Sequence, residues 1–171
     1  LSENKLKLYF SVLCAAALMN LLKRQRDAVG LSLFSDKVNL HTNEKISSKH
    51  HQYLLHELDK VLNQAPLMKT SRLIDGLHQI AENIHQRSLV ILFSDMFDNS
   101  DKSEELFSAL QHLKFNKHEV VLFHVMDKSK ELEFNYENRP YKFVDMETGE
   151  ELKLSPNEVN KNFKAQSQEF L

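Results

Sequence analysis

The sequence is poor in cysteine, glycine and proline, and it contains no tryptophan. A single cysteine cannot form an internal disulfide, so we expect a reducing compartment. Three glycines and three prolines, where average usage would give about 20 such residues, disfavour an all-β sandwich or propeller. Because Gly30, Gly76 and Gly149 lie far apart, they exclude a glycine-rich phosphate loop.

An excess of charge of one sign is also missing. The 22 Lys and Arg residues nearly balance the 24 Asp and Glu residues, and the net charge is -2. A nucleic-acid-binding protein needs a basic excess on one face, so we expect no nucleic-acid partner. The 171 residues, 42% of them hydrophobic, are enough for one compact domain, and we predict a single domain over residues 1–171.

Nearly continuous apolar runs predict strands that are buried on both faces. Three such runs occur, at residues 28–34, 88–93 and 119–125. Helical stretches are predicted before them, at residues 4–24, 49–63, 71–86 and 102–114. Alternation of helices with buried strands predicts an α/β fold with three layers, in which helices cover both faces of a mostly parallel central sheet. Phe10, Phe34, Phe93 and Phe123 are core residues by this pattern.

Shorter signals complete the secondary structure. Residues 37–41 are interpreted as an edge strand, and residues 141–144 and 151–154 alternate around Thr148–Gly149 as a β-hairpin does. The residues Ser155-Pro156-Asn157-Glu158 predict the start of a C-terminal helix, because they combine a Ser cap, a Pro at the first helical position and a Glu.

The apolar run at residues 9–22 resembles a signal or membrane segment, but it is short and is interrupted by Ser11 and Asn20. A membrane span needs about 20 apolar residues, so we interpret the run as a helix buried on most sides and expect no membrane span. With no targeting segment predicted, we expect the cytoplasm. An anchor upstream of Leu1 remains an alternative.

Acidic residues follow each buried strand, where ligands bind in open parallel sheets. Asp36 and Asp127 are interpreted as turn or cap residues, since Asp is common where a strand leads into a loop. Asp95 is interpreted as functional, because it follows the most hydrophobic strand and the next helix has its own cap in Ser100 or Asp101. With a hydroxyl of Thr70 or Ser71, Asp95 could form part of a Mg²⁺ site.

Other site chemistries have weaker support. His51 and His56 are five residues apart, which does not place two ligands on one helical face. His78 and His85 are seven apart and could share a face, but no cysteine or acidic residue is placed to complete a site. The histidines are therefore interpreted as solvated or partly buried rather than metal-binding. No nucleophile motif occurs, and Cys14 lies in an apolar helix where a thiol is inert.

Several segments resemble one bacterial family in the same order along the chain. They are residues 22–38, residues 71–78, the run Arg87-Ser88-Leu89-Val90-Ile91-Leu92-Phe93-Ser94-Asp95-Met96-Phe97-Asp98, residues 118–127, 131–134 and 145–150. The family is domain-of-unknown-function family 58, and the resemblance extends from Lys5 onward. It implies a von Willebrand factor type A-like fold.

Proteins of this fold often carry a metal-ion-dependent adhesion site. The resemblance implies that Ser71, with Thr70 beside it, stands where the fold has a Thr ligand, and that Asp95 is the last Asp ligand. The Asp-x-Ser-x-Ser loop of such sites is not in the sequence, and we expect it, with the first strand, upstream of Leu1. If that loop is present, the cofactor would be Mg²⁺ or Mn²⁺.

The resemblance implies a non-enzymatic protein-interaction domain whose partner is a MoxR-type AAA+ ATPase. A structural module with a degenerate site stays open as a second interpretation, because fold does not fix function. A metal-dependent hydrolase or phosphatase that uses Asp95 and Asp98 is the alternative, although the sequence shows no convincing general base.

Overall fold

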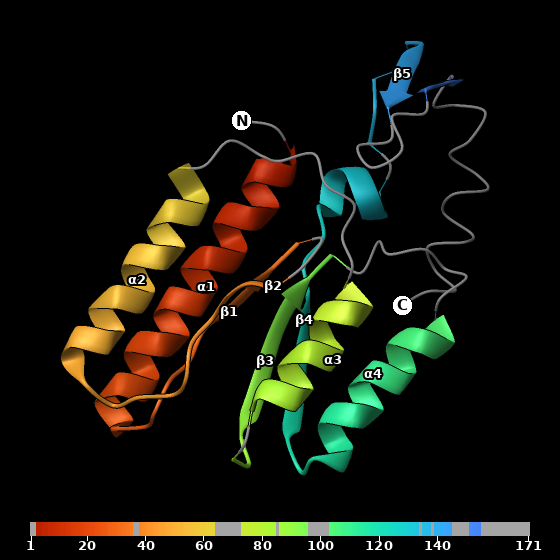
Figure 1. The fold of residues 1–171 in the computed structure, drawn as a ribbon. Helices are drawn as coiled ribbons and strands as arrows, with labels where there is room; N and C mark the ends of the chain where they lie inside the picture. Colours follow the sequence, from red (N-terminus) through yellow and green to blue (C-terminus); the bar gives the residue numbers. More distant parts are fainter. Residues whose placement is uncertain are drawn as a thin grey trace. The chain divides into compact units, whose positions relative to one another are not determined.

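A computed structural model describes residues 3–35, 38–63, 73–84, 86–95, 103–133, 135–137, 139–144 and 151–154 (Figure 1). The chain divides into two compact units, Leu1–Val125 and Met126–Leu171. The single domain over residues 1–171 stays a prediction.

The first unit alternates helices and strands as predicted. Its elements are α1 (Glu3–Gln25), β1 (Ser32–Phe34), β2 (Val38–His41), α2 (Ser48–Asn63), α3 (Leu73–Asn83), β3 (Leu89–Ser94), α4 (Ser103–Phe115) and β4 (Glu119–His124). All four helical predictions for this unit are confirmed, with shifts of a few residues at the ends. The strands predicted at residues 37–41, 88–93 and 119–125 are confirmed in the same way, whereas only Ser32–Phe34 of the predicted strand 28–34 forms a strand. The fold is thus a mixed helix and strand fold.

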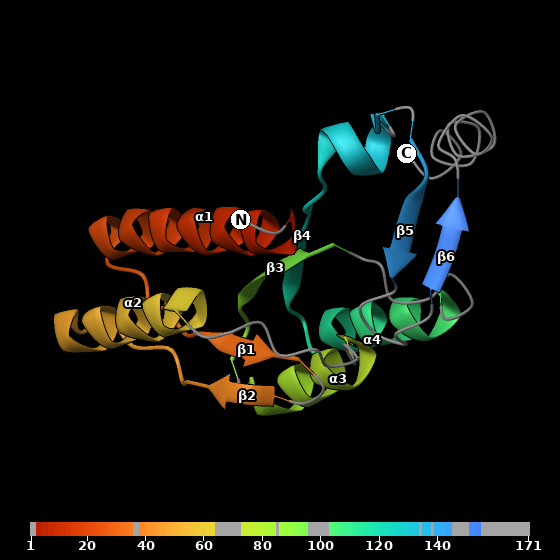
Figure 2. The same cartoon turned by 90° about the horizontal axis from the view of Figure 1, so that it is seen from above.

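Strands β3 and β4 form a parallel pair across the connecting helix α4, as the sequence predicts (Figures 1 and 2). Their register runs from Leu89 opposite Glu119 to Ser94 opposite His124. Strand β1 pairs antiparallel with β2 instead of joining β3. In the part of the chain that the structure describes, the strands therefore form two-stranded sheets and not the single, mostly parallel sheet that was predicted.

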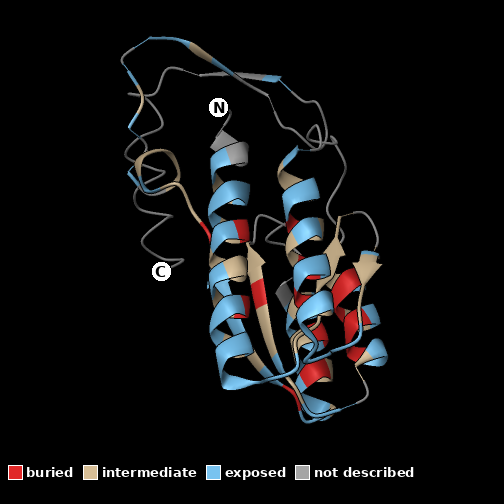
Figure 3. Ribbon diagram, turned by 90° about the vertical axis from the view of Figure 1, so that its left-hand side faces the viewer, coloured by how far each residue is buried: buried red, intermediate tan, exposed pale blue. Residues whose placement is uncertain are grey.

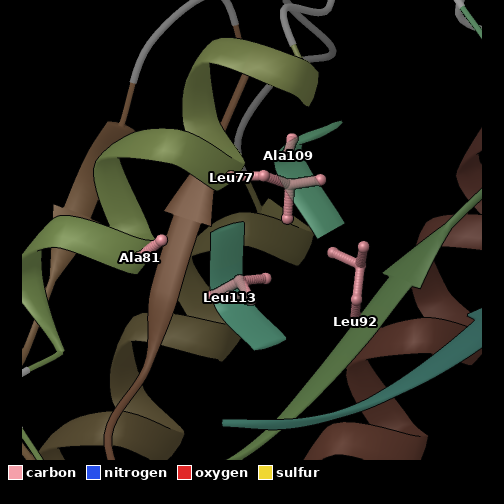
Figure 4. Packing of buried hydrophobic residues seen from close by; sticks show 5 residues of the cluster. All are labelled: Leu77, Ala81, Leu92, Ala109 and Leu113. Carbon is pink, nitrogen blue, oxygen red and sulfur yellow. The ribbon is translucent and has the colours of Figure 1, made fainter. Parts of the chain in front are cut away.

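The main hydrophobic core lies where α3, α4 and β3 meet (Figure 4). Its buried members come from all three elements: Leu77, Ala81, Leu92, Ala109 and Leu113. The two alanines are small, which lets the helices approach closely. The Phe34 ring of β1 packs against the same cluster. A Cβ at Gly76 would meet that ring at 3.2 Å, so a glycine in α3 leaves room for it.

A second cluster joins α1 to α2, which lie side by side in Figures 1 and 2. Val12 and Met19 of α1 meet Leu54 and Leu58 of α2, and apolar residues of the β1 segment, Val29, Leu31 and Leu33, pack against them. The β1 segment thus contacts the α1–α2 pair through this cluster and α3 through Phe34.

Helix α1 is far less buried than predicted (Figure 3). The buried apolar residues on it are Val12 and Met19, whereas its exposed large side chains are Leu6, Leu8, Tyr9, Phe10, Leu13 and Leu21. The prediction of a helix buried on most sides is wrong, because α2 and the β1 segment cover only one side. Residues Leu6–Gln25 are also long and apolar enough to cross a membrane. The expectation that this apolar segment is too short for a membrane span is therefore wrong. Core helices and signal sequences share that property, so the absence of a span stays a prediction.

Strand β4 is also more exposed than predicted. Val121, Leu122 and Phe123 are 41%, 37% and 44% exposed, so β4 is not buried on both faces. The assignment of Phe10 and Phe123 to the core is wrong, because these side chains are 57% and 44% exposed. The apolar sequence of β4 allows burial on both faces, but it does not show that another element of the unit covers each face.

The second unit contains the predicted hairpin. Strand β5 (Tyr141–Val144) pairs antiparallel with β6 (Glu151–Leu154), which confirms the prediction, and the π-helix η2 (Lys128–Leu132) comes before them. Asp127 caps η2, since its Oδ1 accepts from the backbone N–H groups of Ser129 and Lys130. Its interpretation as a structural residue is confirmed. The turn at residues 148–149 and the C-terminal helix predicted from residue 155 lie outside the described residues.

The α3–α4–β3 core allows a direct test of packing. Leu113 is fully buried, so Leu113→Ala should lower the free energy of unfolding by about 2–5 kcal/mol through lost burial and a cavity. Phe115, on the same helix, is 85% exposed, and Phe115→Ala should change stability by less than about 0.5 kcal/mol. Urea unfolding measures both. Equal losses in the two variants would contradict this assignment of the core.

Candidate functional site

Asp95 lies directly after β3, at the carboxyl end of the parallel pair. Its carboxylate is paired with the ammonium of Lys7 on α1, with 3.2 Å between Oδ2 and Nζ. The Asp95 side chain is 48% exposed, whereas that of Lys7 is only 11% exposed. Much of the Lys7 stem is thus covered while its charge reaches the strand end, which ties the first turns of α1 to this edge of the sheet.

His124 is the last residue of β4 and lies opposite Ser94 in the register. Its Nε2 is 2.9 Å from the backbone oxygen of Asp95. A carbonyl oxygen only accepts, so Nε2–H is the donor. We call Asp95, Lys7 and His124 the Asp95 site.

Two aromatic rings adjoin the Asp95 site. Phe93 and Phe123 occupy opposite positions in β3 and β4, and their rings stack with centroids 4.9 Å apart and planes 10° apart. Phe123 is exposed and Phe93 is half-buried, and each lies one or two residues before a member of the Asp95 site along the chain.

The other predicted ligands do not fall within the described residues. Ser71 and Thr70 lie outside them, as do Asp36 and Asp98, the second carboxylate of the hydrolase alternative. Among the described residues, no three His, Cys, Asp or Glu side chains gather in a way that could hold a metal ion. The described part of the chain therefore supplies one predicted ligand, Asp95, and that ligand is already paired with Lys7.

The histidines on α2 have separate surroundings. His50 Nε2 lies 3.0 Å from the backbone oxygen of Val29 and so links α2 to the β1 segment. His51 is buried, and its Nε2 has no hydrogen-bond partner among the described residues, whereas His56 is exposed.

The family of the chain follows from its sequence over nearly its whole length. The family model described as "Protein of unknown function DUF58" matches residues 2–169. The chain belongs to this family. No curated protein and no solved structure matches it. Membership in DUF58 confirms the family that the sequence segments predict, and the description of that family assigns no function.

Two residues of the Asp95 site in this DUF58 chain were not predicted. His124 could have been found from the parallel pairing, since the last residue of β4 must lie beside the end of β3. Lys7 precedes Asp95 by 88 residues, and no local pattern links a helix residue to a strand end over that distance.

The Lys7–Asp95 ion pair bears directly on cation binding. A divalent cation at the Asp95 carboxylate must either displace the Lys7 ammonium or bind beside it, and the two positive charges repel each other. Lys7→Met should therefore strengthen Mn²⁺ binding about fivefold, since an ion pair of this exposure contributes up to about 1 kcal/mol. Calorimetric titration with Mn²⁺ measures the change.

Lys60→Met is the matched control, because Lys60 pairs with Glu57 on α2. This variant should leave Mn²⁺ affinity unchanged. Equal Mn²⁺ affinity in Lys7→Met and the unchanged protein would show that Lys7 does not compete with a cation.

Proposed function

We propose that this DUF58 protein is a non-enzymatic protein-interaction domain that binds an acidic group of a partner at the Asp95 site. The observation that supports the proposal is the exposure of large apolar side chains on the elements that carry that site. Phe10, one turn after Lys7 on α1, is 57% exposed, and Phe123 of β4 is 44% exposed. Large apolar side chains around a few polar groups are typical of surfaces that bind proteins.

The proposal includes a three-layer, von Willebrand factor type A-like arrangement of the first unit. Two contacts support it. Leu92 of β3 packs on the α3–α4 pair, and Lys7 of α1 reaches Asp95 at the end of the same strand. A parallel strand pair with helices on both faces is the arrangement that such contacts favour.

The strand edges support the same arrangement. In the described residues β1 pairs with β2 alone and β3 pairs with β4 alone, so each pair has an open edge. Helix α3 packs against Phe34 of β1 and Leu92 of β3 through one cluster. A further strand between β1 and β3 would join the two sheets under α3. Two-stranded sheets are marginal by themselves, so such a strand would add stability.

The proposed Mg²⁺ or Mn²⁺ ion needs more ligands than the described residues provide. Asp95 is one carboxylate, and hard divalent cations take six or more oxygen ligands, including water. Ser71, Thr70 and an Asp-x-Ser-x-Ser loop would have to supply the rest. When bound, the ion would offer positive charge to an acidic group. Without it, Lys7 is the positive group at the Asp95 site.

We propose a MoxR-type AAA+ ATPase as the partner, on the strength of the family resemblance. The Asp95→Ala variant should lower the Mg²⁺-dependent affinity for the purified ATPase at least about tenfold, because it removes a ligand of the proposed ion that would bind the partner's acidic group. Surface plasmon resonance with and without Mg²⁺ measures the affinity.

Asp59→Ala is the matched control, since Asp59 is an exposed acidic residue of α2. It should bind the ATPase as well as the unchanged protein does. Equal binding by the Asp95→Ala variant would refute the proposed surface. Hydrolysis of phosphate or carboxylate esters that Asp95→Ala abolishes would instead favour the hydrolase alternative.

A further inference from the structure

Two histidines from different helices meet at the edge of the α3–α4 contact. The Nδ1 atoms of His78 and His112 are 3.1 Å apart, and the ring centroids are 5.3 Å apart with planes inclined by 43°. Both side chains are half-buried. We propose that His78 and His112 form a two-histidine site for a divalent transition metal such as Zn²⁺, Ni²⁺ or Cu²⁺.

The packing around the pair holds the two rings in place. Leu77 and Ala81, on either side of His78 in α3, are buried, and so are Ala109 and Leu113, around His112 in α4. One turn further along, Asn116 Nδ2 donates to the backbone oxygen of Ala81 at 2.9 Å. The helices that carry the histidines are therefore fixed against each other, which reduces the ordering that metal binding requires.

The distance between the two nitrogens suits a transition metal. Two imidazoles bound to Zn²⁺ at about 2.0–2.1 Å in a tetrahedral arrangement have their nitrogens about 3.3–3.4 Å apart. In a square-planar arrangement, which Cu²⁺ and Ni²⁺ favour, the same bonds place the nitrogens about 2.8–3.0 Å apart. The observed 3.1 Å lies between these values, so the separation of the nitrogens would change by only a few tenths of an ångström in either arrangement.

Metal binding determines which ring nitrogens of His78 and His112 carry protons. Between two neutral rings, one Nδ1 carries a proton and donates, and the other Nδ1 accepts. A metal bound to both nitrogens needs both lone pairs, so the donating ring must carry its proton on Nε2 instead of Nδ1, and both rings stay neutral. Binding weakens as the pH falls, because protons compete with the metal for the ring nitrogens. Mg²⁺ prefers oxygen ligands and should not compete for this site.

The site has two protein ligands in the described part of the chain, where no third His, Cys, Asp or Glu joins them. Water would fill the other coordination positions. A metal held by one ligand from each helix would clamp α3 to α4. It should raise the melting temperature of the protein, because the ligand pair is assembled only in the folded state.

Calorimetric titration of the full chain with Zn²⁺ tests the proposal. The unchanged protein should bind one Zn²⁺ saturably. His78→Asn and His112→Asn should each weaken binding at least about tenfold, since even residues that only support a metal ligand contribute 10- to 100-fold. Asparagine keeps an oxygen near the Nδ1 position and so retains a hydrogen-bonding group. Melting curves without metal show whether each variant folds.

His56→Asn is the matched control, because His56 is an exposed histidine on α2, and its affinity for Zn²⁺ should equal that of the unchanged protein. Absence of saturable Zn²⁺ binding would overturn the proposal. So would unchanged affinity in folded His78→Asn and His112→Asn variants. Neither result depends on Asp95 or on an ATPase, so the outcome is separate from that of the proposed function.

Discussion

The first unit depends on the packing of α3. This helix contacts α4 through Leu77 and Ala81, and the same cluster includes Leu92 of β3 and the ring of Phe34 from β1. Helix α3 thus connects two sheets that share no hydrogen bonds in the described residues. Gly76 is part of this contact, since it leaves the space that the Phe34 ring occupies. Without α3, the β1–β2 hairpin and the β3–β4 pair would lose the cluster that they share.

The secondary structure was largely predictable from the sequence, because local periodicity and capping encode it. The hairpin of β5 and β6 is a clear example: alternation around Thr148–Gly149 predicts both strands with the observed bounds. Burial was harder to predict. The apolar runs of α1 and β4 led to an expectation of deep burial, yet their side chains are largely exposed. The hydrophobicity of a segment shows that it could be buried, but it does not show whether another element of the fold covers it.

The candidate site was only partly predictable, and the reason is topological. Asp95 could be identified because the carboxyl end of a parallel strand is defined by the strand itself. Lys7 and the partnership of His78 with His112 depend on how helices pack, which single-helix spacing cannot reveal. Spacing within one helix therefore could not predict the pairing of His78 with His112, which are 34 residues apart.

The parallel connection of β3 to β4 also bears on how the chain folds. These strands are joined by residues 95–118, which include all of α4, whereas β5 and β6 are joined only by residues 145–150. Closing a longer loop costs more chain entropy before any ladder bond forms, and hairpins form within about 1–10 μs. We therefore expect the hairpin to form early and the parallel pair late, since the pair needs α4 in place. Until then the apolar strands of this pair are the segments most exposed to aggregation during synthesis.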